Sequence, residues 1–495
     1  MDQIEHIIDG AAVAGTSGRK APVFNPATGA QTGEVALASV NEVDAAVASA
    51  KTAFGDWSQQ SLARRTKVMF AFRNAVEANI DELAARITAE HGKVLSDAKG
   101  EVLRGLENIE FACGIADQLK GSYSESASTG VDVYSVRQPL GVVAGITPFN
   151  FPAMVPLWMI PNAIACGNAF VLKPSEKDPS APRFLVELAL EAGVPPGVLN
   201  LVNGDKEAVD RLLTHPDVKA ASFVGSTPIA RYVSDTATAY GKRVQALGGA
   251  KNHMVVLPDA DIDLAADSAV SAAYGSAGER CMAISVVVAV GAVADPLIDA
   301  IKVRMEKLVI GDGTDSSSEM GPLITREHRD RVAGYVGAGA DAGATVVVDG
   351  RERRFDGDGF FLGTTLLDHV TPDMTVYQDE IFGPVLSVVR VDSYAEGVDL
   401  IRTNPWGNGT AIFTQNGGAA RQFQEDADAG MVGINVPVPV PVGYHSFGGW
   451  KESLFGDTTM YGPEGVRFYT KAKVITSRWP DPANSRVDLG FPTNQ

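Results

Sequence analysis

The sequence predicts an α/β protein with two separate sheets, and three observations lead to this prediction. The 495-residue chain is longer than one hydrophobic core normally serves, so two or three domains are expected. From Gly141 onward, short apolar runs alternate with stretches that repeat apolar residues at helical spacing. That alternation is typical of βαβ units, which build a parallel sheet covered by helices on both faces.

The first 120 residues are expected to form an irregular arm followed by helices. Residues 1–40 are rich in turn-forming residues and contain only short β-type runs. From Asn41 to Lys120, apolar residues recur at three-to-four spacing, which predicts several helices, the first of them capped by Asn41. The acidic start of the chain has no apolar core segment, so neither a secretory signal nor a transit peptide is expected.

Residues 121–138 break this helical pattern. A turn rich in Gly and Ser leads into residues 131–136, which alternate in polarity as an exposed strand does. Such a polar two-stranded excursion is either an assembly arm or a solvated hairpin. The tail, residues 466–476, alternates in the same way, and we expect it to pair with the 131–136 strand of another subunit.

The parallel-sheet region begins at Gly141. The strands predicted in its first half are 142–146, 169–172, 199–202, 220–224 and 244–247, with helices near 153–166, 182–192, 206–213 and 227–239. A second α/β region runs from Met254 to about residue 460, with strands at 254–257, 286–290, 345–348, 385–391 and 410–413 and helices near 295–308, 325–342 and 417–428. Ligands bind such sheets at the carboxyl ends of the strands.

Composition argues against several classes of partner and site. The chain has 42 Lys and Arg against 60 Asp and Glu, a net charge of −18, so nucleic-acid and membrane partners are not expected. Its three cysteines, Cys113, Cys166 and Cys281, form no disulfide framework and indicate a reducing compartment, so we expect a cytoplasmic location. Because C-x-x-C pairs and clustered histidines are missing, no metal site is predicted.

Cys281 is the candidate nucleophile. It follows a turn of small residues, Gly275 to Gly278, and the cation of Arg280, which favours the thiolate over the thiol. A thiolate placed there can attack an electrophilic carbon. A small buried hydrophobe is the commoner fate of a free cysteine, and this stretch alone favours that interpretation.

Two predicted strand ends carry groups that suit a dinucleotide. Lys173 and Glu176 follow one strand, and a glutamate there can bind both ribose hydroxyls while repelling a 2′-phosphate, which favours NAD over NADP. Gly225 and Ser226 open a helix whose free N–H groups suit a pyrophosphate. A solvated turn and a plain helix cap are equally good interpretations of these two segments. The six-residue glycine fingerprint of ordinary dinucleotide folds is missing from this region.

Two further loops offer polar side chains. The amide of Asn150, in an apolar loop bounded by prolines, can donate to a developing oxyanion, or it can simply satisfy loop backbone. Glu380 places a carboxylate in a turn beside the aromatic ring of Phe382, for which a surface loop is the alternative.

Together, five motifs resemble those of the aldehyde dehydrogenase superfamily in order and approximate spacing. They are Pro148-Phe149-Asn150-Phe151-Pro152, Lys173-Pro174-Ser175-Glu176, Phe223-Val224-Gly225-Ser226, Gly278-Glu279-Arg280-Cys281 and Glu380-Ile381-Phe382-Gly383-Pro384. The resemblance covers nearly the whole chain. It implies a variant Rossmann NAD-binding domain (1–120 and 139–248), an α/β catalytic domain (249–462) and a small β oligomerisation element (121–138 and 463–495), in a homodimer or homotetramer.

The resemblance also implies residue roles. Cys281 would be the nucleophile that forms a thiohemiacetal, and the Asn150 amide and the Cys281 backbone N–H would form the oxyanion hole. Within the cofactor site, Lys173 and Glu176 would hold the adenosine ribose, and Gly225 and Ser226 the pyrophosphate. Glu380 would hold the nicotinamide ribose, and Phe149 and Phe382 complete the implied NAD-binding set.

The segment after the strand at 244–247 departs from the family's pattern. Hydrolytic members carry Glu-Leu-Gly-Gly there, and the glutamate activates the water that cleaves the thioester. In this chain the position, counted back from Asp259, falls on Leu247, and the neighbouring Ala246 is not a base either. Because a general base contributes about 10²–10⁴-fold, hydrolysis should be slow, and the thiol of coenzyme A is the expected acceptor.

Further runs resemble the CoA-acylating methylmalonate-semialdehyde dehydrogenases, among them Gly249-Ala250-Lys251-Asn252-His253 and Asn435-Val436-Pro437-Val438-Pro439-Val440-Pro441. That subfamily places two arginines on the substrate carboxylate, at the positions of Arg104 and Arg280. A planar guanidinium binds a carboxylate through two parallel hydrogen bonds. For Arg104 the alternative is an ion pair with Glu101 or Glu107 on the helix surface.

These features predict an enzyme that oxidises methylmalonate or malonate semialdehyde with NAD and coenzyme A. The products would be propionyl-CoA or acetyl-CoA and carbon dioxide, with coenzyme A as co-substrate at a site that no basic cluster marks. A hydrolytic aldehyde dehydrogenase that releases a free acid is the first alternative. A non-catalytic binding or structural protein on the same scaffold is the second.

Overall fold

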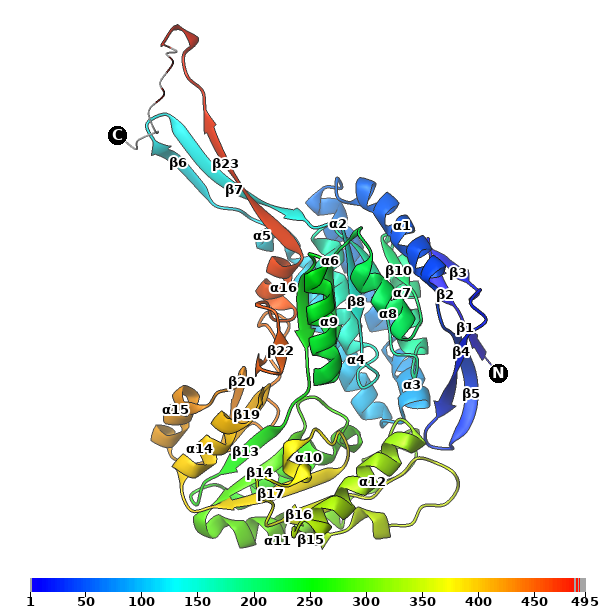
Figure 1. The fold of residues 1–495 in the computed structure, drawn as a ribbon, viewed down its shortest axis with the longest axis vertical. Helices are drawn as coiled ribbons and strands as arrows, with labels where there is room; N and C mark the ends of the chain where they lie inside the picture. The colour runs from blue at the N-terminus through cyan, green and yellow to red at the C-terminus, as the bar shows by residue number, and fades with distance from the viewer. Residues whose placement is uncertain (1, 485–486, 488, 490–495) are drawn as a thin grey trace.

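The computed structural model describes residues 2–484, 487 and 489 and has the α/β architecture that the sequence predicts. Figure 1 shows an upper body around one sheet, a lower body around a second sheet, and a narrow arm that projects from the upper body. Within the described residues, no helix is both long enough and apolar enough to cross a membrane.

The upper body is built on an eight-stranded sheet in the order β22-β12-β11-β8-β9-β10-β2-β3. Its parallel centre consists of β8 (Val142–Ile146), β9 (Ala169–Lys173), β10 (Leu199–Leu201), β11 (Val218–Val224) and β12 (Arg243–Leu247). The helices between these strands are α6 (Met154–Ala165), α7 (Ser180–Glu191), α8 (Lys206–Thr214) and α9 (Thr227–Ala239). Because the five strands run in one direction, their carboxyl ends share one edge of the sheet.

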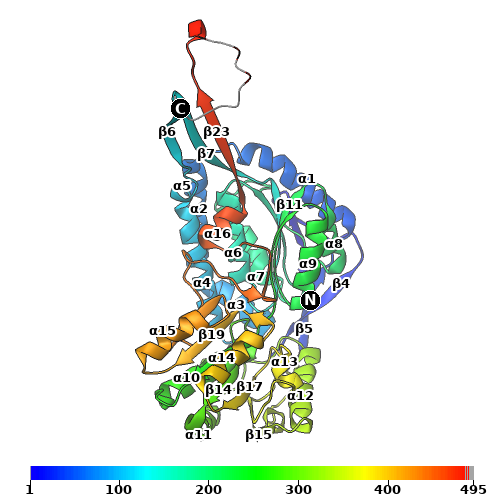
Figure 2. The same cartoon turned by 60° about the vertical axis from the view of Figure 1, so that its left-hand side comes forward.

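Helices cover both faces of this sheet (Figure 2). One face carries α1 (Val40–Trp57), α8 and α9, and the other carries α6 and α7. Behind α6 and α7 lie α2 (Leu62–Ala78), α3 (Ile80–His91), α4 (Leu95–Cys113) and the short α5 (Ile115–Gln118). The predicted cap at Asn41 is wrong: Ser39 caps α1, and its side chain and backbone exchange hydrogen bonds with Glu42 in a capping box.

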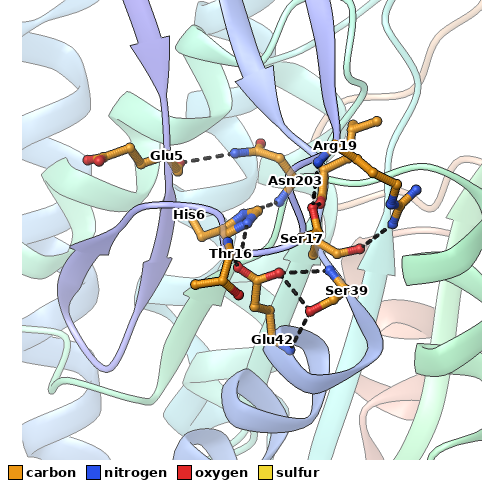
Figure 3. Close-up of polar contacts among 10 residues, drawn as sticks. Glu5, His6, Thr16, Ser17, Arg19, Ser39, Glu42 and Asn203 are labelled. Carbon is orange, nitrogen blue, oxygen red and sulfur yellow. Dashed lines mark hydrogen bonds and ion pairs between the residues drawn. The ribbon is translucent and has the colours of Figure 1, made fainter.

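The N-terminal arm is more regular than its sequence predicts. Its strands β1 (Asp2–Ile4), β4 (Lys20–Asn25) and β5 (Ala30–Ala36) form a small sheet, whereas β2 (His6–Ile8) and β3 (Ala11–Val13) extend the large one. Figure 3 shows the polar contacts that fix the N-terminal arm. Asn203 donates its backbone N–H to Nδ1 of His6 at 3.1 Å, and Thr16 donates to the Glu42 carboxylate at 2.7 Å. These partners are distant in sequence, so the local pattern could not reveal them.

The lower body is built on a seven-stranded sheet in the order β15-β16-β17-β14-β13-β19-β20, parallel except for the β15–β16 pair. Its strands are β13 (Asn252–Val256), β14 (Ile284–Val290), β15 (Thr345–Val348), β16 (Thr365–Asp368), β17 (Val385–Val391), β19 (Gly409–Phe413) and β20 (Met431–Ile434). Its helices are α10 (Ile262–Tyr274), α11 (Ala294–Met305), α12 (Arg326–Asp341), α13 (Thr375–Gln378), α14 (Tyr394–Thr403) and α15 (Gly417–Asp426).

The chain then returns from the lower body to the upper one. The strands β18 (Trp406–Gly407) and β21 (Trp450–Lys451) pair with each other, and β22 (Leu454–Phe455) pairs with β12 at the edge of the first sheet. The predicted catalytic range, 249–462, therefore contributes one strand to the upper sheet.

The projecting arm consists of β6 (Tyr123–Ser128), β7 (Val131–Pro139) and β23 (Thr470–Arg478). The expectation that the tail pairs with another subunit is wrong for this ladder, since β23 pairs antiparallel with β7 of the same chain from Thr470↔Pro139 to Arg478↔Val131. The helix α16 (Gly462–Phe468) ends beside the base of β7, so β23 pairs with β7 without a second molecule.

Candidate active site

The predicted motifs meet at the facing edges of the two sheets. Asn150 follows β8, Lys173 ends β9 and Gly225 follows β11, all at the carboxyl edge of the first sheet. Cys281 precedes β14 and Glu380 precedes β17, two neighbouring strands at the amino edge of the second sheet. Residues far apart in the sequence are thus gathered where the two bodies meet.

A cleft of about 660 Å³ lies between these edges. The predicted site residues on its walls are Phe149, Asn150, Gly225, Ser226, Cys281, Glu380 and Phe382. Lys173 and Glu176 are not among its lining residues, and they form an ion pair with 3.5 Å between Lys173 Nζ and Glu176 Oε2. In the part of the chain that the structure describes, no group of three or more His, Cys, Asp or Glu side chains is placed to hold a metal ion.

The turn before Cys281 has an unusual backbone. Ser276, Ala277 and Gly278 all have positive φ, at 53°, 53° and 75°. A Cβ on Gly278 would lie 2.2 Å from the carbonyl oxygen of Gly383, so only glycine allows this turn to pack against the loop that carries Glu380.

Two asparagines fix the backbone of the nucleophile itself. The carbonyl of Cys281 accepts hydrogen bonds from Asn252 Nδ2 at 2.9 Å and from Asn408 Nδ2 at 3.1 Å. Asn252 opens β13 and Asn408 directly precedes β19, so two neighbouring strands of the second sheet hold one carbonyl. Sequence reasoning missed this role for both residues because a single asparagine carries no recognisable pattern.

The thiol of Cys281 is partly exposed in the cleft and is protonated in this environment. Burial by the surrounding protein, together with the Glu380 carboxylate, raises the pKa of Cys281 to about 12. The backbone N–H groups of Cys281 and Met282 and the cation of Arg280 lower this pKa, but they are outweighed. Arg280 therefore acts in the predicted direction without making the resting cysteine a thiolate.

Glu380 is held close to the turn that follows β12. Its Oε1 accepts the backbone N–H of Ala250 at 2.9 Å, and a Cβ on Gly249 would lie 2.3 Å from its Oε2. Burial raises the pKa of Glu380 to about 7. Its neighbour Phe382 has a positive φ of 59°, and its carbonyl oxygen accepts a hydrogen bond from His328 Nε2 at 2.7 Å.

The cleft has the groups that a dinucleotide requires. Gly225 and Ser226 lie at the start of α9, where the first-turn N–H groups and the helix dipole suit an anion. Lys177 and Arg331 add two cations to the walls, and Lys177 Nζ lies 4.8 Å from the centre of the Phe149 ring. Sequence reasoning missed both cations, although Lys177 directly follows the Lys-Pro-Ser-Glu motif. The residues present therefore fit NAD.

The two arginines predicted for the substrate carboxylate have protein partners. Arg280 donates from Nη2 to Asp97 Oδ1 at 2.7 Å, and its guanidinium lies so close to Gly275 that a Cβ there would be 2.5 Å from Nη1. Arg104 forms the ion pair with Glu107 that was the alternative to a substrate role, at 2.8 Å. The other candidate partner, Glu101, instead pairs with the buried Lys93.

Leu247 shares a hydrophobic cluster with Cys281, and Ala246 does not. The side chain of Leu247 is 2% exposed and belongs to the large core of the upper body, against which Cys281 packs. Ala246 packs on the other side of β12, with Phe223 and Val244. Of these two positions at the end of β12, the one that shares a core cluster with Cys281 is therefore occupied by an aliphatic side chain.

Comparisons with known proteins agree with these motifs. Residues 13–475 match the model of the aldehyde dehydrogenase family. A malonate-semialdehyde dehydrogenase of Pseudomonas aeruginosa is 54% identical over 100% of both chains. The structure of a methylmalonate-semialdehyde dehydrogenase from Oceanimonas doudoroffii is similar with a TM-score of 0.96 and 55% identity, over 98% of this chain and 99% of that one. A protein described as a methylmalonate-semialdehyde dehydrogenase from Sinorhizobium meliloti, solved in complex with NAD, has a TM-score of 0.97 and 54% identity over 98% and 99%.

Proposed function

Because the chain belongs to the aldehyde dehydrogenase family, we propose that it is a NAD-dependent, CoA-acylating semialdehyde dehydrogenase. Its substrates are methylmalonate and malonate semialdehyde, and its products are propionyl-CoA or acetyl-CoA and carbon dioxide. The relatives named for these two semialdehydes support the substrate class. The cleft and its anion-binding helix terminus support the dinucleotide.

The chemistry begins at Cys281. Its thiol proton first passes to solvent, because the resting cysteine is protonated and partly exposed. The thiolate then attacks the aldehyde carbon, and the carbonyl oxygen becomes an oxyanion that the Asn150 amide and the Cys281 N–H stabilise. Asn150 is 4% exposed, and Lys93 Nζ holds its backbone carbonyl at 2.6 Å, so the amide is presented from a fixed loop. When bound, NAD would supply the hydride acceptor, and the oxidised carbon would remain on Cys281 as a thioester.

The residues of the cleft would hold the cofactor for that step, together with Lys173 and Glu176, which come shortly before the cleft residue Lys177 in the sequence. The start of α9, with Gly225 and Ser226, takes the pyrophosphate, and Lys173 and Glu176 take the adenosine ribose. Glu380 takes the nicotinamide ribose. The rings of Phe149 and Phe382, with centroids 5.8 Å apart, form an apolar wall beside it.

The substrate carboxylate is bound by Arg280 and Arg104 and then lost. A thioester with a carboxylate on the next carbon can release carbon dioxide, because the electron pair left behind becomes an enolate that the Asn150 oxyanion hole stabilises. Protonation of the enolate carbon leaves propionyl or acetyl thioester on Cys281.

The observation that carries the choice of acceptor is Leu247. Hydrolysis of the thioester needs a base that activates water, and the residue at the end of β12 that shares a core cluster with Cys281 is aliphatic. The thiol of coenzyme A is a better nucleophile than water and attacks the thioester carbonyl, and the Cys281 thiolate leaves. The competing function, a hydrolytic aldehyde dehydrogenase, requires a base that this position does not supply.

Replacing Leu247 with glutamate should create hydrolysis. We expect NADH formation without coenzyme A to rise by about 10²-fold, the lower end of what a general base contributes, with a free acid as product. The matched control is Leu247→Gln, which introduces a side chain of similar size without a base and should gain nothing. If both variants, folded as judged by their melting temperatures, behave like the parent enzyme, another feature controls the acceptor.

The domain roles follow the same family pattern. Residues 1–120 and 139–248 bind the cofactor, residues 249–462 carry the nucleophile, and 121–138 with 463–495 form an oligomerisation element in a homodimer or homotetramer. Of these ranges, residues 1, 485–486, 488 and 490–495 lie outside the described residues. The projecting arm, on which Tyr123 and Val474 are 63% and 67% exposed, supports assembly through this element (Figure 1). The three free cysteines support a reducing, cytoplasmic environment.

A further inference from the structure

Arg104 is fully engaged by the protein on the edge that a carboxylate would use. Its Nη1 donates to both oxygens of Glu107, at 2.8 and 3.0 Å. Its Nη2 donates to the carbonyl oxygens of Val440 and Pro441, at 3.1 and 2.8 Å. The side chains of Arg104 and Glu107 both project from α4, and each is one-third exposed. With both terminal nitrogens occupied, Arg104 has no pair of parallel N–H groups left for a second carboxylate.

Arg280 is in a different state. It donates to Asp97 through Nη2 alone, and among the described residues no protein acceptor contacts its Nε or Nη1. One arginine of the pair, next to the nucleophile in the sequence, therefore keeps free donors, while both terminal nitrogens of the other are occupied.

We propose that Glu107 is a specificity-determining residue that holds Arg104 on the backbone of residues 440–441 until a carboxylate-bearing substrate displaces it. This inference rests on the proposed function, because it takes Arg104 as a ligand of the substrate carboxylate. Glu107 acts as an internal stand-in for that carboxylate, and the substrate exchanges one carboxylate for another on the same guanidinium.

The groups that Arg104 leaves behind keep other partners, so the exchange costs little. Glu107 Oε2 also accepts the backbone N–H of Gly443 at 3.1 Å. The carbonyl of Pro441 also accepts the Tyr461 hydroxyl at 2.9 Å. Val440 loses a donor, but it is only partly buried, so water can replace the lost hydrogen bond.

The latch of Glu107 on Arg104 borders the core on which the nucleophile packs. Tyr461 is buried in the core against which Cys281 also packs, and Arg104, Glu107 and Cys281 all act on the pKa of its hydroxyl. Val440 packs against the same core. The segment that Arg104 holds and the nucleophile therefore pack on one core.

The exchange discriminates between substrates by charge. An aldehyde that carries a carboxylate replaces Glu107 with an equivalent anion, so the Arg104 cation stays paired throughout. A neutral aldehyde offers no replacement, and Arg104 stays on Glu107. The ion pair with Glu107 thus sets the free energy needed to release Arg104 for the substrate carboxylate. Weakening that ion pair should strengthen the binding of acidic aldehydes only.

The test is Glu107→Gln, assayed with methylmalonate semialdehyde and with propanal, which lacks only the carboxylate. The glutamine keeps an oxygen for the Gly443 N–H but loses the charge that holds Arg104. We expect KM for methylmalonate semialdehyde to fall about three- to fivefold, the size of a partly exposed ion pair, with kcat and the propanal constants unchanged. The matched control is Glu110→Gln. Glu110 lies on α4 like Glu107, but its exposed carboxylate pairs with Arg73, so this variant should change none of these values.

Two arginine variants separate this inference from the proposed function. Arg104→Met should raise KM for methylmalonate semialdehyde at least tenfold and spare propanal, and the double variant with Glu107→Gln should match it. If Arg104→Met leaves that KM unchanged, the carboxylate role of Arg104 in the proposed function is wrong. If Arg104→Met behaves as expected but Glu107→Gln raises KM, leaves it unchanged, or alters propanal equally, the latch is wrong and the proposed function stands.

Discussion

Replacing Cys281 with alanine should abolish NADH formation from methylmalonate semialdehyde, with a loss of about 10⁴-fold or more in kcat. Removing a covalent nucleophile has effects of this size because the remaining groups stabilise an intermediate that no longer forms. The fold should survive, since the Asn252 and Asn408 side chains hold the Cys281 carbonyl and not its sulfur. The measurement is NADH absorbance under saturating NAD and coenzyme A.

Cys113→Ala is the matched control. Burial raises the pKa of Cys113 to about 11, so its thiol is also protonated, but it lies on α4 and outside the cleft. This variant should retain full activity. An alanine enzyme at position 281 that still reduces NAD with this aldehyde would refute the assignment of the nucleophile.

Replacing Asn150 with alanine should lower kcat by about 10²–10³-fold, the usual cost of removing one oxyanion-hole donor. The loop should keep its place, because Lys93 binds the backbone carbonyl of Asn150 and Glu101 accepts the N–H groups of Ala153 and Met154 at the start of α6. Affinity for NAD, measured by fluorescence titration, should therefore stay within about twofold, and the loss should appear in kcat.

A buried asparagine that does not line the cleft separates this effect from general damage. Asn203 is 0% exposed, and its side-chain amide holds the N-terminal arm by donating to the backbone carbonyl of Glu5 at 3.0 Å (Figure 3). Asn203→Ala should lower the melting temperature and leave kcat unchanged. If Asn150→Ala also changes only the melting temperature, the oxyanion is stabilised elsewhere.

The sequence was sufficient where the signal is local. Apolar runs with helical stretches between them gave the parallel centre of the first sheet, and the predicted α/β class and aldehyde dehydrogenase family are confirmed. It was insufficient where strands are made by distant partners. The N-terminal strands β2 and β3 join the large sheet through β10, and β23 finds β7 across more than 300 residues.

The same distinction holds for the candidate site. Motifs that follow a strand directly, such as Asn150 and Gly225, were found because the strand places them. Arg104 donates to the carbonyl oxygens of Val440 and Pro441, which lie 336 and 337 positions further along the chain. Arg280 and its partner Asp97 are 183 positions apart. No local pattern encodes such contacts. Their effect on substrate choice could be inferred only after the fold had brought them together.

The fate of the acyl group on Cys281 is tested most directly by rapid mixing of enzyme, NAD and methylmalonate semialdehyde, with NADH followed in time and products identified by mass. Without coenzyme A, we expect one NADH per subunit and then near arrest, because Leu247 cannot activate water. Adding coenzyme A should restore steady turnover and yield propionyl-CoA and carbon dioxide. Steady NADH formation without coenzyme A, with a free carboxylic acid as product, would contradict the account.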